Sequence, residues 1–334
     1  MPERPGGCAA GSSAIDSPAT SRLSRRFAAD WTRLLPPGSR AGLAVSGGPD
    51  SLALLLLAHA AFPGTFEVAS VDHGLRDGSA GEAKMVARLC AARGIAHRIL
   101  AVSVPVRGNL QANARAARYE ALAAWLHERG LPALATAHHA DDQAETLLMR
   151  LNRGAGVRGL AAMRECSPLP GAPDLLLLRP LLGWRREELR RIVAEAGIEP
   201  ALDPSNRDAR YARVRIREGL AGASWLDPAA LSESAANLAD ADAALEWAAE
   251  REWSERIIAH PDGLAYDPAA PRAIRLRILA RIAAQLGRSE PRGRELARWL
   301  DSLEQGGTAT LAGVRGDGGD QPWRFVPAPP HRQG

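Results

Sequence analysis

Apolar runs typical of buried strands alternate with stretches of helical periodicity from about residue 40 to 200. The predicted strands are Leu43–Val45, Phe66–Val71, His97–Val102, Leu131–Ala135 and Leu175–Leu178. The predicted helices between them lie around Ser51–Ala61, Ser79–Arg93, Leu110–Arg129 and Asp141–Arg153. This order predicts an α/β fold with a doubly wound, mainly parallel sheet and helices on both faces. In such sheets, ligands bind beyond the carboxyl ends of the strands.

The pattern changes after Arg217. Residues from about Pro228 to Leu303 are typical of Ala- and Arg-rich amphipathic helices without a strand signal, and Thr308–Val326 offers short strands broken by glycine. The first thirty residues are rich in Pro, Gly, Ser and Arg and lack the apolar core of a secretory signal. We therefore predict four segments: a disordered leader over 1–30, the α/β domain over 31–218, a smaller helical domain over 219–305, and a short β-stub with a Pro-rich tail over 306–334.

A glycine turn joins the first predicted strand to the next helix. It reads Ser46-Gly47-Gly48-Pro49-Asp50-Ser51, and Pro49 falls near the first helical position, where its missing N–H costs nothing. Backbone N–H groups of such a turn and of the helix N-terminus bind anions, and two serine hydroxyls add donors. Asp50 is a candidate to hold a metal ion or to orient an attacking group. No Gly-Lys-Ser/Thr follows at Walker spacing, and an ordinary strand-to-helix turn is the alternative.

Two further polar motifs follow strands at the same edge of the predicted sheet. Asp72-His73-Gly74-Leu75-Arg76 ends the second strand; it is either a loop over a nucleotide, with Arg76 near a phosphate, or a surface turn. His138-His139-Ala140-Asp141-Asp142-Gln143-Ala144-Glu145 follows the fourth, and its acids are spaced to converge on one side of a helix. Helix capping is the alternative for these acids, and zinc ligation by the histidines would need a geometry that the sequence does not supply.

Arginines supply candidate phosphate contacts. Arg115 and Arg118 share a helix face and suit a triphosphate or an RNA backbone, or else form a solvated stripe. The turn Asp203-Pro204-Ser205-Asn206-Arg207-Asp208 precedes a run that suits a phosphate track or a solvated helix entry: Arg210, Arg213, Arg215 and Arg217.

Composition narrows the class further. The net charge of +4 permits a polyanionic partner without requiring one. The three cysteines are far apart, which favours a reduced cytosolic compartment and argues against a cysteine metal or redox motif. No apolar run reaches the length of a membrane span.

The glycine turn is similar to the pyrophosphate loop of the N-type ATP pyrophosphatases, which cleave ATP to AMP and pyrophosphate. Over roughly residues 40–220 the chain resembles the tRNA(Ile)-lysidine synthetase family. The blocks that carry the resemblance are SGGPDS, VDHGLR, AHHADDQAETLLMRLNRGAGVRGLAAM, RPLLGWRREEL and DPSNRDARYAR. The resemblance implies an adenine nucleotide alpha hydrolase-like fold and a cytoplasmic enzyme. That enzyme would use ATP and Mg²⁺ to ligate free L-lysine to C2 of the wobble cytidine of an isoleucine tRNA with a CAU anticodon. The helical part would bind the tRNA, and codon specificity would change from AUG to AUA.

The resemblance also implies roles for the motif residues. The nucleotide would be held by Ser46, Gly47, Gly48, Pro49, Asp50, Ser51, Asp72, His73 and Arg76, with Mg²⁺ on Asp50. Arg115 would neutralise phosphate charge, Asp142 and Glu145 would bind the lysine ammonium group, and Arg118 and Arg213 would contact substrate. His138 or Asp141 would take the proton of the lysine amine, whose reference pKa is about 10.4.

The chain departs from the family pattern at Gln111, where Glu is frequent, and at Val214, where Asn is frequent. Its C-terminal part is also short. Other enzymes of the superfamily, such as tRNA thiolases or glutamine-using synthetases, are disfavoured because no suitable cysteine pattern exists. A non-catalytic nucleotide- or RNA-binding module would not need the converging carboxylates. The oligomeric state is left open, a homodimer included.

Overall fold

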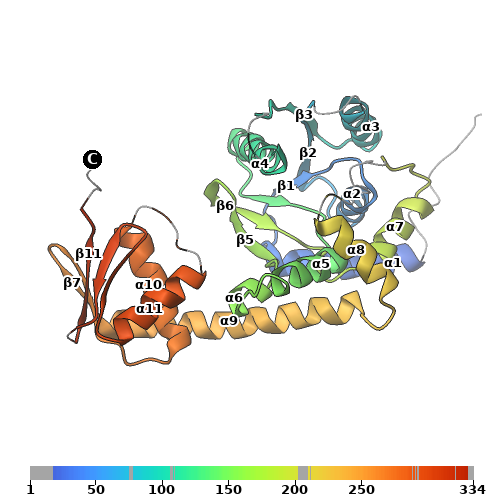
Figure 1. The fold of residues 1–334 in the computed structure, drawn as a ribbon. Coiled ribbons are helices and arrows are strands. Elements are labelled where there is room, and N and C mark those ends of the chain that lie inside the picture. Colours follow the sequence, from blue (N-terminus) through green and yellow to red (C-terminus); the bar gives the residue numbers. More distant parts are fainter. Residues whose placement is uncertain are drawn as a thin grey trace, which may run out of the picture. The chain divides into compact units, whose positions relative to one another are not determined.

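The computed structural model describes residues 18–74, 78–105, 108, 110–201, 210, 212–287, 289, 291, 293–319 and 321–329. The chain divides into two compact units, Met1–Ala236 and Asn237–Gly334 (Figure 1). The division falls inside helix α9 (Pro228–Arg256), later than the boundary predicted at residue 218. Within these residues, every helix is too short or too polar to cross a lipid bilayer.

The first unit is built on a six-stranded sheet in the order β3-β2-β1-β4-β6-β5. The strands are β1 (Ala41–Ala44), β2 (Phe66–Asp72), β3 (His97–Ala101), β4 (Ala133–Ala135), β5 (Cys166–Leu169) and β6 (Ala172–Leu178). All pairings are parallel except that of β5 with β6. The five predicted strands and their parallel arrangement are confirmed. Strand β5 was missed because only Leu169 of its four residues is buried, which leaves no apolar run.

The chain reverses its direction of winding at β1. Strands β2 and β3 lie on one side of β1, whereas β4 and β6 lie on the other. The carboxyl ends of β1 and β4 therefore border a topological switch point, where doubly wound sheets bind their ligands.

Helices cover both faces of this sheet, as predicted. They are α1 (Pro18–Leu34), α2 (Pro49–Ala61), α3 (Ser79–Ala91), α4 (Leu110–Arg129), α5 (Ala140–Leu151), α6 (Val157–Leu160), α7 (Arg186–Glu195) and α8 (Ala212–Gly222). Helices α1, α2, α3 and α7 share one core with β1 and β2, and α4 shares a second core with β2, β4 and β6. Helix α8 packs on α5.

Helix α1 corrects part of the predicted leader. Residues 18–30 belong to this helix rather than to a disordered segment, whereas residues 1–17 lie outside the described residues. Phe27 and Trp31 are buried, and their rings lie 5.6 Å apart, with Phe62 packed against both. Their spacing of four residues places both rings on the face that meets the core.

Helix α4 approaches β1 closely enough to require glycine at position 42. A Cβ atom there would lie 2.5 Å from the Trp125 ring and 2.7 Å from a Leu126 methyl group. We expect Gly42→Ala to lower the free energy of unfolding by about 1–3 kcal/mol, as overpacked cores do. Urea titration measures this. Gly81→Ala is the control, since Gly81 lies in α3 with open space around it and alanine favours a helix by about 0.5–1 kcal/mol. Equal stability of the Gly42→Ala and natural proteins would contradict the packing argument.

The second unit contains an antiparallel sheet in the order β7-β8-β11-β10-β9. Its strands are β7 (Ile257–His260), β8 (Gly263–Tyr266), β9 (Thr308–Leu311), β10 (Val314–Asp317) and β11 (Trp323–Pro327). Its own core joins the sheet to α10 (Arg272–Leu286) and α11 (Gly293–Glu304), with Ile278, Leu300 and Phe325 fully buried.

Two expectations for this unit were wrong. The stretch 228–303 contains strands β7 and β8, and 306–334 is not a separate stub because β9, β10 and β11 complete the same sheet. Strand β7 continues directly from α9, and Ile258 in it is 53% exposed. An exposed edge strand of this kind carries no alternating apolar pattern for a sequence reading to find.

Candidate active site

The loop after β1, Ser46–Ser51, which we call the phosphate loop, is held by its own serine hydroxyls and opens helix α2 at the switch point. Ser46 N–H donates to Ser51 Oγ at 3.1 Å, and Ser51 Oγ donates to the Gly48 carbonyl at 3.0 Å. Helix α2 then begins at Pro49, and within the described residues no side chain caps it. The N–H groups of its first turn are therefore available to an anion.

Two independent requirements favour glycine at position 47. Its φ is +87°, a conformation that favours glycine, and a Cβ atom there would lie 3.2 Å from the Met85 methyl group. The Gly47 carbonyl accepts a hydrogen bond from Ala201 N–H at 2.9 Å. The segment that leads towards α8 is thus attached to the phosphate loop.

Asp50 and His139 connect this loop to α5. Asp50 Oδ1 is buried without a hydrogen-bond partner among the described residues, and Oδ2 lies 3.4 Å from His139 Nε2. His139 is 1% exposed and caps α5: its Nδ1 accepts from Asp142 N–H, and Asp142 Oδ2 accepts from His139 N–H. The Nε2 atom thus faces Asp50 and also lies 3.5 Å from Asp142 Oδ2. His139 was expected only as part of the two-histidine motif, without a role of its own.

His138 is held neutral. Its Nδ1 lies 2.9 Å from Thr136 Oγ1. Burial, together with the cations of Arg179, Arg213 and Arg115, lowers the pKa of His138 to about 3 against the opposing carboxylate of Asp142. A general base works best with a pKa near the operating pH, so His138 is a poor base at pH 7.

Glu145 is surrounded by three arginines. Its Oε1 accepts from Arg186 Nη2 and Arg217 Nε, both at 2.8 Å, and its Oε2 accepts from Arg213 Nε at 2.7 Å. Burial favours protonation of this side chain, which is 1% exposed, but the hydrogen bonds from the arginines outweigh it and bring the pKa to about 2. Glu145 is therefore a charged anchor for α7 and α8.

The carboxylates of Asp142 and Asp141 differ in how many of their oxygens have hydrogen-bond partners. Asp142 Oδ1 accepts from Arg213 Nη2 at 2.9 Å. Asp141 Oδ2 accepts from Arg186 N–H at 2.8 Å, while its Oδ1 has no partner within the described residues. Arg213 bonds to both Glu145 and Asp142, which fits the prediction that these acids lie on one side of a helix, but both oxygens of Glu145 and of Asp142 already have partners. Arg186 was missed as a functional candidate, and Arg217 was noted only as part of the arginine run that suits a phosphate track or a solvated helix entry.

Arg115 and Arg118 do share a face of α4. Their guanidinium carbons lie 4.9 and 5.4 Å from the Tyr119 ring centroid, and Arg115 Nη2 donates to the Tyr119 hydroxyl at 3.2 Å. The electrostatic effect of Arg115 on His138 places Arg115 at the same edge as the acid cluster.

Asp72 closes its own loop instead of joining this cluster. Its Oδ1 accepts from Ser79 Oγ at 2.6 Å and from Gly74 N–H at 3.1 Å, and these bonds lower the pKa of the carboxyl. His73 follows it at the end of β2. Arg76 and the turn over 203–208 lie outside the described residues.

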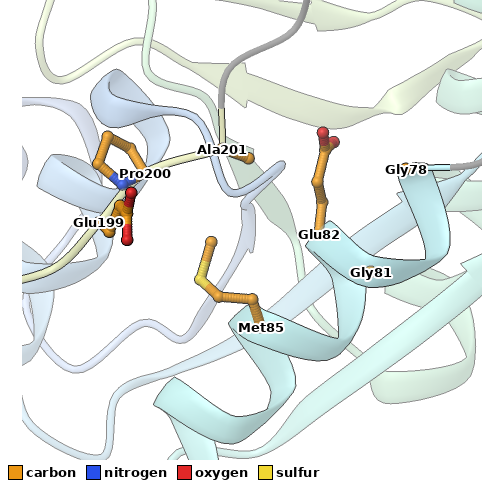
Figure 2. A pocket seen from close by; sticks show the side chains of 7 residues that line it. All are labelled: Gly78, Gly81, Glu82, Met85, Glu199, Pro200 and Ala201. Carbon is orange, nitrogen blue, oxygen red and sulfur yellow. The ribbon is translucent and has the colours of Figure 1, made fainter.

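An open hollow of about 450 Å³ lies beside the phosphate loop (Figure 2). It is lined by Gly78, Gly81, Glu82, Met85, Glu199, Pro200 and Ala201. Met85 and Ala201 are also the neighbours of Gly47, so the hollow borders the loop without including the Asp50–Glu145 cluster.

Comparisons with known proteins agree with this geometry. A PP-loop domain model matches residues 19–223, so the first unit is a PP-loop ATP-binding domain. A tRNA(Ile)-lysidine synthase of Novosphingobium aromaticivorans is 56% identical over 309 residues, covering 92% of this chain and 94% of the relative. One from Zymomonas mobilis is 42% identical, covering 89% and 91%. The chain belongs to the tRNA(Ile)-lysidine synthase family of PP-loop enzymes, which are ATP-dependent ligases.

A solved structure shares the fold alone. The U34-tRNA thiolase NcsA of Methanococcus maripaludis, solved with its [4Fe-4S] cluster, is 16% identical. It superposes with a TM-score of 0.54 over 65% of this chain and 76% of its own.

Proposed function

We propose that this chain ligates the ε-amine of L-lysine to C2 of the wobble cytidine in an isoleucine tRNA with a CAU anticodon, with ATP cleaved to AMP and pyrophosphate. The supporting observation is the meeting of two groups at the switch point: the phosphate loop with its unpartnered Asp50 oxygen, and the acid–arginine cluster of α5 and α8. The relatives that match nearly the whole chain are named for this product.

The phosphate loop would bind the ATP. The N–H groups of Gly47, Gly48 and the first turn of α2, with the hydroxyls of Ser46 and Ser51, would stabilise the charge that develops on the departing pyrophosphate. Asp50 fits Mg²⁺, because its Oδ1 is buried without a partner and Mg²⁺ prefers a few carboxylates together with phosphate oxygens and water. When bound, the ion would withdraw charge from the phosphate oxygens.

The arginines would serve the base-activation step. Cytosine O2 attacks the α-phosphorus, and the bond to pyrophosphate breaks. Arg115 and Arg213 would neutralise the phosphate, and His138 offers an uncharged polar group beside them. The lysine amine then attacks C2, and the C2–O2 bond breaks as AMP leaves with that oxygen. The target base must be unpaired, which an anticodon loop allows.

The acid cluster would receive the lysine. Since Glu145 and Asp142 are already bound to arginines, we assign the ammonium group chiefly to Asp141, whose Oδ1 has no partner in the described part of the chain. The same oxygen would take the proton that the amine must lose before attack, because it would already contact the ammonium group.

Mass spectrometry of nucleosides after incubation with tRNA, ATP and lysine tests this function. The expected result is a cytidine carrying one lysine residue, with AMP and pyrophosphate formed in equal amounts over many turnovers and AMP released only when lysine is present. Formation of ADP and orthophosphate, or turnover indifferent to the amino acid supplied, would refute it.

A further inference from the structure

Trp225 is an exposed aromatic ring on the loop between α8 and α9. Its side chain is 81% exposed. The loop is ordered by backbone bonds: Ala223 N–H donates to the Leu220 carbonyl and Leu226 N–H to the Ala223 carbonyl. The second bond closes a turn with Ser224 and Trp225 at its centre, so the indole is presented by a fixed backbone. Residues 219–226 carry no charged side chain.

A chain of side-chain contacts places this turn near the acid cluster. Arg185 Nε lies 3.7 Å from Asp141 Oδ2, and Arg185 Nη1 donates to Asp227 Oδ1 at 2.8 Å. The Arg185 guanidinium group therefore contacts both the acid cluster and Asp227. Asp227 also caps α9, because its Oδ1 accepts a hydrogen bond from Ala229 N–H. Trp225 precedes Asp227 by two residues, a backbone distance of at most about 7 Å.

We infer that Trp225 stacks on an unpaired base of the tRNA anticodon loop, next to the cytidine held at the site; this inference rests on the proposed function. Single-stranded bases splayed from a loop stack on aromatic side chains. Such stacking contributes to the binding affinity without discriminating between base types. The surroundings suit a polyanion, since Arg185 and Arg213 keep 39% of their side chains exposed.

The other strongly exposed indole lacks these properties. Trp247, on α9, is 64% exposed, but Arg251 already covers it with its guanidinium carbon 5.3 Å from the ring centroid. Glu246 and Glu250 stand one and three residues away on the same helix and pair with Arg277 and Arg281, so the cations nearby already have partners. Trp247→Ala is therefore a matched control.

The test is steady-state kinetics with varied tRNA. We expect Trp225→Ala to raise the KM for tRNA by about 5- to 150-fold, the range for loss of one base–aromatic stack, with kcat and the KM values for ATP and lysine unchanged. Trp225→Phe should restore most of the affinity, and Trp247→Ala should leave it unaltered. Because stacking neutralises no phosphate, the slope of log affinity against log salt should be the same in Trp225→Ala as in the natural chain.

Binding of tRNA, followed by quenching of tryptophan fluorescence, separates this inference from the proposed function. Quenching that is lost in Trp225→Phe would support stacking even if no lysidine formed. An unchanged KM for tRNA in Trp225→Ala would overturn the inference while leaving the reaction intact. A dimer that light scattering detects in the natural chain and not in Trp225→Ala would also overturn it, since a second copy would then cover the ring.

Discussion

Asp50→Asn should lower kcat for AMP formation by about 100-fold or more. The substitution keeps the shape of the side chain and removes the negative charge of a carboxylate whose Oδ1 is buried without a partner. Charge stabilisation by a bound metal ion is worth several kcal/mol in the transition state, and each factor of ten in rate is 1.36 kcal/mol. Lysine- and tRNA-dependent release of AMP at saturating ATP measures the effect, and raised Mg²⁺ should recover part of it.

The stability of this variant should be nearly natural, because Asp50 makes no hydrogen bond that asparagine would lose. Asp174→Asn is the matched control: Asp174 is a carboxylate paired with His127 at 2.7 Å and 63% exposed. It should leave kcat unaltered. Normal AMP release by Asp50→Asn at low Mg²⁺ would remove the proposed metal role.

The sequence predicted the centre of the sheet because β1, β2 and β4 are buried over most of their length. Leu43, Val68 and Leu134 are fully buried, so their segments appear as continuous apolar runs, as the strands of parallel sheets do. The phosphate loop could be located for a related reason, since a positive φ at Gly47 and a helix start at Pro49 each require a particular residue type.

The partners of the charged groups could not be predicted in this way. Glu145 bonds to Arg186 and Arg217, which lie 41 and 72 residues away along the chain. Spacing on α5 placed the acids on one side of a helix, but it carries no information on which distant side chain meets them. Glu145 therefore looked like a free receptor for an ammonium group, whereas three guanidinium groups occupy it.

His138 and His139 show the same limit within two residues. The sequence marks both histidines as polar groups after a strand. Only the backbone directions at the start of α5 decide that His139 faces Asp50 while His138 contacts Thr136.

Elements with weak apolar patterns were missed for a different reason: the exposed strand β7 and the edge strand β5 are defined by pairing rather than by burial.

Glu145→Gln should both destabilise the first unit and impair catalysis. Gln keeps the shape of the side chain but leaves three arginines without their anion. Because Glu145 is buried while the arginines are part-exposed, we expect the loss to cost about 2–4 kcal/mol of unfolding free energy. Displacement of Arg213 and α8 by about 1 Å should lower kcat about 100-fold. The KM for lysine should change less than about threefold, because Asp141 rather than Glu145 is assigned to the ammonium group.

Glu67→Gln is a closely matched control for this variant. Glu67 is 4% exposed and accepts hydrogen bonds from Arg40 and Arg129, but it lies near the start of β2, at the opposite edge of the sheet from the site. Both variants should lower the urea midpoint, and only Glu145→Gln should lower kcat of the folded protein. A large rise in the lysine KM with normal kcat would instead restore the direct ammonium contact.

The pH dependence of stability gives an independent test of the arginine anchor. The pKa of Glu145 falls from 4.5 to about 2 in the folded chain, because hydrogen bonds from Arg217, Arg186 and Arg213 outweigh the effect of burial. A lowered pKa means that the folded state binds fewer protons than the unfolded state, so this stabilisation is complete above about pH 4.5 and is lost as the pH falls towards 2. Glu145→Gln should therefore lose less stability than the natural chain between pH 5 and pH 2. Parallel curves for the two proteins, measured by urea unfolding, would show that Glu145 is not held ionised by its arginines.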